Sequence, residues 1–139
     1  MSVFRTTSTP IRVYYEDTDF SGFAYHGSYL RFLERGRSEL LREAGFTNKK
    51  LFESDGIVFA VRSLEIDYIS PALMDDLLRA ETTIARVGGA SLHFEQHMFR
   101  DDQEIVSAKV RVAVLRSGKP IRIPALLREV LGGSGAAPR

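Results

Sequence analysis

The stretch 28–44 has its apolar and small residues at helical spacing. They recur every three or four positions: Tyr29, Leu33, Gly36, Leu40 and Ala44. Such spacing is typical of one face of an amphipathic helix, and Gly45 stands where helices commonly end. We therefore predict a helix over 28–44. Glycine inside a helix costs about 1 kcal/mol relative to alanine, so Gly36 indicates a close packing contact.

After this helix the pattern changes to a period of two, which is typical of β-strands. Residues 57–69 are apolar on both faces at first and then alternate, whereas 77–87 and 105–115 alternate throughout. A fourth strand contains Leu92, Phe94 and Met98, and a short strand, RVYYE at 12–16, precedes the helix. The order predicts an α+β fold, in which a curved five-stranded antiparallel sheet wraps one long central helix.

Length and composition are those of one globular domain. The 139 residues, 44% of them hydrophobic, are enough for one sizeable core. We expect a single domain over 1–131 and a disordered tail, GGSGAAPR, at 132–139. No apolar run reaches the roughly 20 residues of a membrane span, and the N-terminus lacks the core of a signal peptide. A cytoplasmic location is therefore expected.

Charge and cysteine content exclude several classes of function. The net charge of +1 gives no global indication of a nucleic-acid or membrane-surface binder. The absence of cysteine excludes a thiol nucleophile, a disulfide framework and a Cys-type zinc site. Any catalysis must therefore use oxygen or nitrogen groups.

Three acids, Glu16, Asp17 and Asp19, stand close together just before the predicted helix. Loop acids most often make turns, and Asp19 could cap a turn through its side-chain oxygen. Nearby aromatic residues favour a second interpretation, an apolar pocket that raises the basicity of Asp19: Phe20, Phe23, Tyr25 and Tyr29. The N–H groups at the start of the helix suit a developing oxyanion. A carboxylate this close to an oxyanion site predicts an acyl-transfer centre.

The segment VYYEDTDFSGFAYHGSYLRFLERGRSELLREAGF closely resembles the acyl-CoA thioesterases of the YbgC and 4-hydroxybenzoyl-CoA thioesterase group. The resemblance continues through VRSLEIDYISPALMDD and GGASLHFEQ to the IPALLREV segment. It implies the hotdog fold and the hydrolysis of an acyl-CoA to the free acid and coenzyme A. No metal or redox cofactor is expected, and coenzyme A enters only as part of the substrate.

The resemblance also implies residue roles. The last acid of the family's E-D-x-D phrase is the catalytic nucleophile or general base, which corresponds to Asp19. A backbone N–H at the helix start polarises the thioester carbonyl, and His26 occupies that position, although a histidine there could simply cap the helix. The family's helix acid near the acyl pocket corresponds to Glu34, which is equally placed to pair with Arg31 or Arg37.

Oligomerisation and further substrate contacts follow from the same resemblance. It implies a homodimer, commonly doubled to a homotetramer, with the active site at the subunit interface. The strand at 57–64 of one subunit then faces Asp19 of the other. Further expected substrate-binding residues lie in that strand and beside the acidic motif: Tyr25, Phe59, Val61 and Arg62. Acyl-carrier protein is an alternative carrier to coenzyme A, and no nucleic-acid partner is expected.

Between Ile105 and Arg128 there is no acid but there are six bases, a composition that suits phosphate binding. For Lys119 and Arg122 the resemblance favours contact with the nucleotide end of coenzyme A, and Arg86 is the next candidate. We interpret Lys109 and Arg111 as solvent-facing.

The alternation H-F-E-Q-H at 93–97 could present three metal ligands on one face of a strand. The buried partners expected between them favour a solvated outer face instead. Two other functions stay open: a hotdog dehydratase or isomerase, and a non-catalytic acyl-carrier or envelope-associated interaction module.

Overall fold

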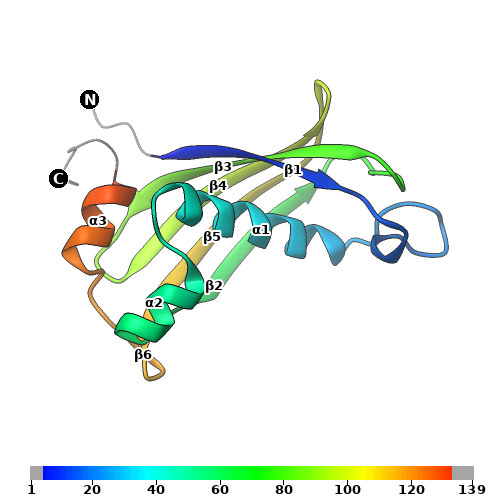
Figure 1. The fold of residues 1–139 in the computed structure, drawn as a ribbon. Coiled ribbons are helices and arrows are strands. Elements are labelled where there is room, and N and C mark those ends of the chain that lie inside the picture. The colour runs from blue at the N-terminus through cyan, green and yellow to red at the C-terminus, as the bar shows by residue number, and fades with distance from the viewer. Residues whose placement is uncertain (1–4, 133–139) are drawn as a thin grey trace.

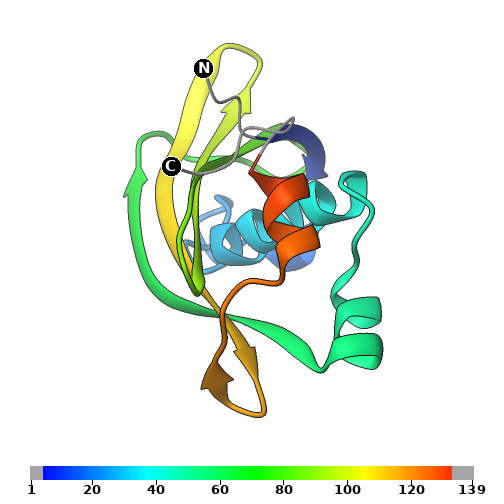
Figure 2. The ribbon, with the colours of Figure 1, turned by 90° about the vertical axis from the view of Figure 1, so that its left-hand side faces the viewer.

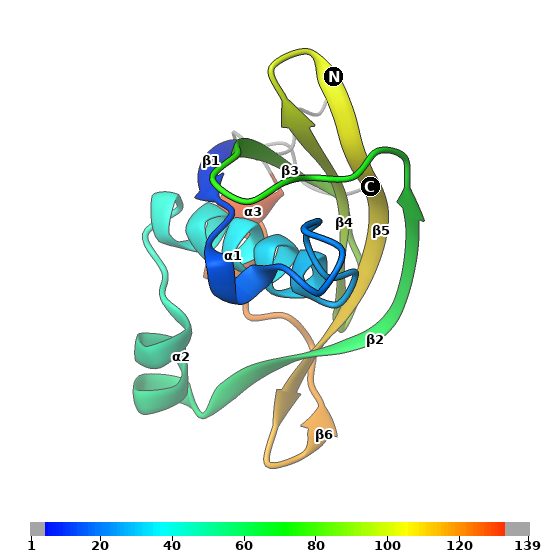
Figure 3. The ribbon, with the colours of Figure 1, turned by 90° about the vertical axis from the view of Figure 1, so that its right-hand side faces the viewer.

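A computed structural model describes residues 5–132. Its elements are β1 (Thr6–Arg12), the short 3-10 helix η1 (Tyr15–Asp17), α1 (Ser28–Glu43), α2 (Asn48–Asp55), β2 (Ile57–Tyr68), β3 (Leu77–Val87), β4 (Ser91–Arg100), β5 (Gln103–Arg116), β6 (Lys119–Pro120) and α3 (Ala125–Leu131). The strands form one antiparallel sheet in the order β1-β3-β4-β5-β2, with β6 paired to β5. The sheet curves around α1 from β1 on one side to β2 on the other (Figures 1 and 3). This is the predicted architecture.

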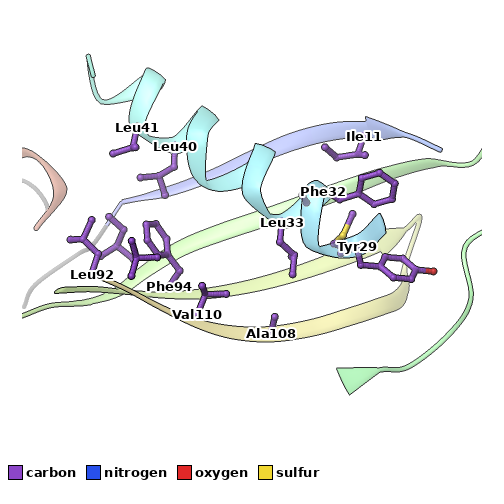
Figure 4. Packing of buried hydrophobic residues seen from close by; sticks show 14 of the residues in the cluster. Ile11, Tyr29, Phe32, Leu33, Leu40, Leu41, Leu92, Phe94, Ala108 and Val110 are labelled. Atoms are coloured by element: carbon purple, nitrogen blue, oxygen red, sulfur yellow. The ribbon is translucent and has the colours of Figure 1, made fainter. Parts of the chain in front are cut away.

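The predicted helix is confirmed in position and in buried face. Ala44 is its C-cap, and Gly45 follows with φ +97°, a left-handed conformation that favours glycine. The buried residues of α1 pack onto inward side chains of β4 and β5, as Figure 4 shows. The labelled contacts come from both layers: Tyr29, Phe32, Leu33, Leu40 and Leu41 from the helix, and Leu92, Phe94, Ala108 and Val110 from the sheet.

At Gly36 the helix lies close against the sheet. A Cβ placed there would lie 2.6 Å from Thr82 Oγ1 and 3.1 Å from Gln96 Nε2. Gln96 and Thr82 are fully buried, and Gln96 Nε2 donates hydrogen bonds of 2.9 Å to both the Leu33 carbonyl and Thr82 Oγ1. The missing side chain therefore makes room for a polar bridge between helix and sheet. The close contact predicted from Gly36 is confirmed.

The first strand does not lie where it was predicted: the prediction of a strand at 12–16 is wrong. β1 lies earlier, in TTSTPIR, where only Thr7 and Ile11 are buried, so its apolar alternation is weak. It is an edge strand, which tolerates Pro10. After Arg12 the chain leaves the sheet and turns into η1.

Two short helices, α2 and α3, were not predicted. Both lie at the end of the molecule away from η1 (Figures 1 and 2). The Thr47 side chain caps α2 by accepting the Lys50 N–H. Leu127 and Leu131 anchor α3 in the core. The disorder predicted for 132–139 lies outside the described residues, apart from Gly132, the C-cap of α3. Within 5–132, no helix combines the length and the apolar character needed to cross a membrane.

Gly36→Ala is expected to lower the free energy of unfolding by about 1–3 kcal/mol, the usual cost of overpacking. At an exposed helix position the same change would raise the free energy of unfolding by about 1 kcal/mol. The sign of the change therefore shows whether Gly36 makes a close contact. Urea unfolding measures the difference. Adding Thr82→Ala should recover part of the loss, because it removes the oxygen nearest the new methyl group. A stabilised Gly36→Ala protein would contradict the close contact.

Candidate active site

The acids before α1 occupy different environments, and Asp17 is the buried one. Its Oδ2 accepts the Tyr14 N–H at 2.8 Å, and its Oδ1 accepts a guanidinium N–H of Arg31 at 2.9 Å. Its carbonyl oxygen accepts hydrogen bonds from the Tyr25 N–H and the Ser28 hydroxyl. Asp17 thus ties the 14–25 loop to the first turn of α1. Its role is to hold the loop in place.

Asp19 is exposed and caps its own turn. Its Oδ1 accepts the backbone N–H of Ser21 at 2.8 Å and the Ser21 hydroxyl at 2.5 Å. Within residues 5–132, Oδ2 has no hydrogen-bond partner. The hydroxyl and then the N–H of Ser21, together with nearby His26, hold the pKa of Asp19 below its ordinary value. The turn interpretation of Asp19 is confirmed.

The prediction that an apolar pocket surrounds the Asp19 carboxylate is wrong for the single subunit. Phe20 is fully exposed to solvent, so it does not cover the carboxylate. The two donors of Ser21 favour the charged form, and the pKa is therefore lowered where burial would have raised it. Of the four aromatic residues, only Phe23 and Tyr29 line a cavity with Asp19.

Asp19 and His26 meet in one open cavity of about 350 Å³. The other lining residues come from the same loop, from α1, from the end of β2 and from the segment that follows it: Ser21, Phe23, Ala24, Tyr29, Tyr68, Ile69, Ser70 and Pro71. The N–H groups of His26 and Gly27 donate no hydrogen bond within the described chain, and α1 has neither a side-chain cap nor an acid in its first turn. The positive end of the helix is therefore available to an oxyanion.

Tyr25 lies beside this cavity without lining it. Its ring centroid is 4.4 Å from that of His26. A Cβ at Gly27 would lie 2.7 Å from the Tyr25 ring, so a larger residue there would displace the ring. Tyr68 donates a hydrogen bond of 3.3 Å to the His26 carbonyl. Tyr25 and Tyr68 therefore fix the conformation of the helix start. Tyr68 was not predicted, because only the fold brings the end of β2 to this loop.

A second cavity, of about 220 Å³, lies between α1, α2 and the sheet. It brings together three of the predicted substrate-binding residues, Glu34, Phe59 and Val61. Other apolar side chains complete its walls: Leu41, Ile57, Val58, Leu92, Phe94 and Val112. Its polar lining also includes Arg37, Ser38 and Asn48. No role in the site was predicted for these three residues, although Arg37 stands one turn after Glu34.

Lys119 and Arg122 lie far from Asp19 in the same chain. They are exposed at the β5–β6 hairpin, whose turn residues Ser117 and Gly118 have positive φ angles. The hairpin is next to Ile57, which pairs with Arg116 at the start of β2, whereas the other end of β2 lines the Asp19 cavity. A strand of 12 residues spans about 40 Å at roughly 3.3 Å per residue. The two ends are visibly separate in Figure 1.

The two remaining predicted cations, Arg62 and Arg86, do not line the Asp19 cavity. Arg62 is exposed where the pairing of β2 with β5 shifts register. Arg86 lies on the outer face of the sheet, in one cross-strand row with His93 and Arg111. Burial, followed by the charges of these two arginines, lowers the pKa of His93.

The outer-face interpretation of 93–97 is confirmed. Its polar residues alternate with the buried Leu92, Phe94 and Met98 along β4. His97 Nδ1 lies 2.6 Å from Glu104 Oε2 on the neighbouring strand. These side chains are therefore engaged in cross-strand contacts.

Comparison with known proteins places this geometry in a family. Residues 21–107 match the model of the thioesterase superfamily. The acyl-CoA thioesterase YbgC of Haemophilus influenzae is 45% identical over 119 residues, which cover 84% of this chain and 88% of the relative. This chain belongs to the thioesterase superfamily. Membership confirms the predicted enzyme class, a thioester hydrolase, and with it the hotdog fold.

Two further matches agree with membership in the thioesterase superfamily. The acyl-CoA thioester hydrolase YbgC of Escherichia coli O6:H1 is 40% identical over 98 residues, 70% of this chain and 72% of the relative. A crystal structure of a probable thioesterase from Bartonella henselae is 43% identical, with a TM-score of 0.83 over 86% of this chain and 99% of that one.

Asp17→Ala is expected to lower the free energy of unfolding by about 2–3 kcal/mol, because it leaves the partners of a buried carboxylate unpaired. The matched control is Glu16→Ala, an exposed acid one residue away, which should stay within about 0.5 kcal/mol of wild type. Chemical denaturation of both variants measures the difference. Equal stabilities would show that Asp17 does not anchor the loop.

Proposed function

We propose that this thioesterase hydrolyses an acyl-CoA, with Asp19 and the start of α1 as its reaction centre. The observation that carries the proposal is the cavity lined by both Asp19 and His26, where a free carboxylate oxygen meets free helix N–H groups. The acyl-CoA substrates in the names of the relatives support the choice of thioester. Their hydrolase activity favours hydrolysis over the dehydratase, isomerase and non-catalytic alternatives.

In the proposed reaction the thioester carbonyl oxygen accepts a hydrogen bond from the backbone N–H of His26. The positive end of α1 stabilises the oxyanion that forms as the carbonyl carbon becomes tetrahedral. Asp19 Oδ2 then acts in one of two ways. It attacks the carbonyl carbon, which expels the thiolate and gives a mixed anhydride that water hydrolyses, or it takes the proton of an attacking water. Ser21 holds Oδ1 in both cases, so the carboxylate keeps one orientation.

Asp19→Asn is expected to lower kcat at least 10²–10⁴-fold, roughly the contribution of general acid–base catalysis, while the melting temperature stays close to wild type. His26→Ala should cost less, because it preserves the main-chain N–H. Thiol release from a graded series of acyl-CoAs measures both variants. Near-normal turnover by Asp19→Asn would remove Asp19 from the mechanism.

The pH profile of the same assay tests the contact with Ser21. Asp19 must be ionised to act, and the hydrogen bonds of Ser21 lower its pKa. Ser21→Ala should therefore move the acidic limb of the kcat/KM profile to higher pH. An unmoved limb would mean that a group other than Asp19 controls it.

We further propose that a homodimer is the functional unit. β2 forms a free edge of the sheet, and Val58, Val61 and Tyr68 on or beside that edge are 39–50% exposed. Antiparallel pairing of two β2 strands about a two-fold axis would satisfy the edge. It would also bring the partner's Lys119 and Arg122 towards the Asp19 end of this chain, where they can bind the phosphates of coenzyme A. The tetramer, acyl-carrier protein as an alternative carrier, and the cytoplasmic location stay predictions.

The double variant Lys119→Ala/Arg122→Ala is expected to raise KM for an acyl-CoA and leave kcat nearly unchanged. Charges far from the reacting bond stabilise the ground and transition states about equally. An acyl-pantetheine thioester lacks the nucleotide, so its KM should not change. Steady-state kinetics on both substrates make the comparison. Equal KM increases for the two would show that the hairpin is structural.

Subunit mixing tests whether the hairpin acts across the dimer. Refolding the double variant together with Asp19→Asn should restore low-KM turnover, because one interface then combines an intact Asp19 with an intact hairpin from the other chain. The separately refolded variants are the controls. Failure of the mixture to regain low-KM activity would exclude the contribution of the partner.

A further inference from the structure

We propose that the second cavity binds a carboxylate at the far end of the acyl group and that Arg37 recognises it. The inference rests on the proposed acyl-CoA thioesterase function and specifies its substrate class as medium-chain acyl groups that end in a carboxylate. Four observations support the inference: the composition of the cavity, the lack of an ion-pair partner for Arg37 among the described residues, the orientation of Arg37 by Gln96, and the distance from Arg37 to the start of α1.

The cavity is lined mostly by apolar side chains, together with a few polar ones. Phe59, Val61 and Phe94 are among the side chains that would contact methylene groups, and Arg37 is the one cation among the lining residues. Such a composition suits a ligand with an apolar chain and one polar end. A purely alkyl chain would leave Gln96 Oε1 as the one hydrogen-bond acceptor for the guanidinium within residues 5–132.

Arg37 is partly desolvated and has no ion-pair partner. Burial lowers its pKa, against the opposing charge of Glu34 one turn earlier. No carboxylate of residues 5–132 lies within 4.0 Å of its guanidinium, and its side chain donates a single hydrogen bond, to Gln96 Oε1 at 3.1 Å. A guanidinium carries five N–H donors, so most of them remain for a ligand. A carboxylate matches this fork with two parallel hydrogen bonds.

Gln96 fixes the position of Arg37. The amide is fully buried, and its nitrogen is committed to the Leu33 carbonyl and Thr82 Oγ1. Its oxygen is thereby directed to Arg37. A buried amide in an apolar core is tolerated only when its hydrogen bonds are satisfied. The polar bridge beneath Gly36 therefore also orients the arginine, as a preformed binding site requires.

The other polar groups favour an acceptor over a donor. Ser38 Oγ accepts the Asn48 side-chain N–H at 3.1 Å, which leaves the Ser38 hydroxyl hydrogen for a ligand. Glu34 is the one acid of the lining, and it is exposed, so water weakens the effect of its charge without removing it. Arg37 and Ser38 thus present donors, and a carboxylate supplies the matching acceptors.

The separation from the reaction centre sets the chain length. Arg37 lies ten residues after Gly27 on α1, roughly 15 Å at 1.5 Å per residue. Both cavities are lined by α1 and β2, with Tyr29 and Tyr68 at one end and Arg37 and Phe59 at the other. A thioester held at His26 would therefore need a medium-length chain, running between helix and strand, to place its terminal carboxylate at Arg37.

The test compares substrates of equal length that differ only in the terminal carboxylate: adipyl- with hexanoyl-CoA, suberyl- with octanoyl-CoA, and sebacyl- with decanoyl-CoA. The readout is the ratio of kcat/KM within each pair. Wild type should favour one or more of the carboxylated members, and Arg37→Met should lower that ratio roughly 10- to 100-fold. Arg37→Lys should fall between, because lysine keeps the charge without the fork.

Two further variants make the comparison specific. Arg35→Met, an exposed arginine on the same helix, should keep the wild-type ratio. Glu34→Gln should raise the ratio, because it removes the negative charge near the proposed carboxylate. A ratio that Arg37→Met does not change overturns the inference, even when both series are cleaved.

Binding of the free acids separates this inference from the proposed function. Suberate should raise the melting temperature of wild type more than octanoate does, and Arg37→Met and Arg37→Lys should reduce that difference. If wild type cleaves no acyl-CoA of the graded series either, the proposed function fails and this measurement alone decides the inference. Equal effects of suberate and octanoate on wild type overturn it.

Discussion

The contact of α1 with the sheet at Gly36 determines the position of both cavities. Gln96 and Thr82 reach the helix there, and a polar bridge of this kind holds only when the backbones approach closely. The start of the helix carries the free N–H groups of the proposed reaction centre, and its side carries Glu34 and Arg37. A shift of α1 along the sheet would therefore change the oxyanion site and the second cavity together.

Much of the fold was predictable from hydrophobic periodicity. α1, β3, β4 and β5 each bury one face, so their apolar residues recur at regular spacing. β1 was misplaced because an edge strand of threonine and serine buries few side chains, and Asp17 turns the chain immediately after it. α2 and α3 are too short to show a clear helical period, and their positions depend on packing at one end of the sheet.

The candidate site was predictable in identity but not in environment. The acidic motif pointed to Asp19 and the helix start pointed to His26, and both line the first cavity. The second donor to Asp19, the Ser21 hydroxyl, depends on the conformation of the turn. The proposed role of Arg37 depends on its contact with Gln96, 59 residues away. Such contacts leave no periodic signal in the chain.

The division of labour between Asp17 and Asp19 has an evolutionary consequence. The buried carboxylate of Asp17 anchors the loop, whereas the exposed carboxylate of Asp19 makes hydrogen bonds only within its own turn in the described residues. A single substitution at position 19 would therefore end the proposed chemistry and leave the scaffold and its cavities intact. Descendants of such a chain would keep the proposed thioester site, so new reactions or pure binding proteins could arise from this fold in one step.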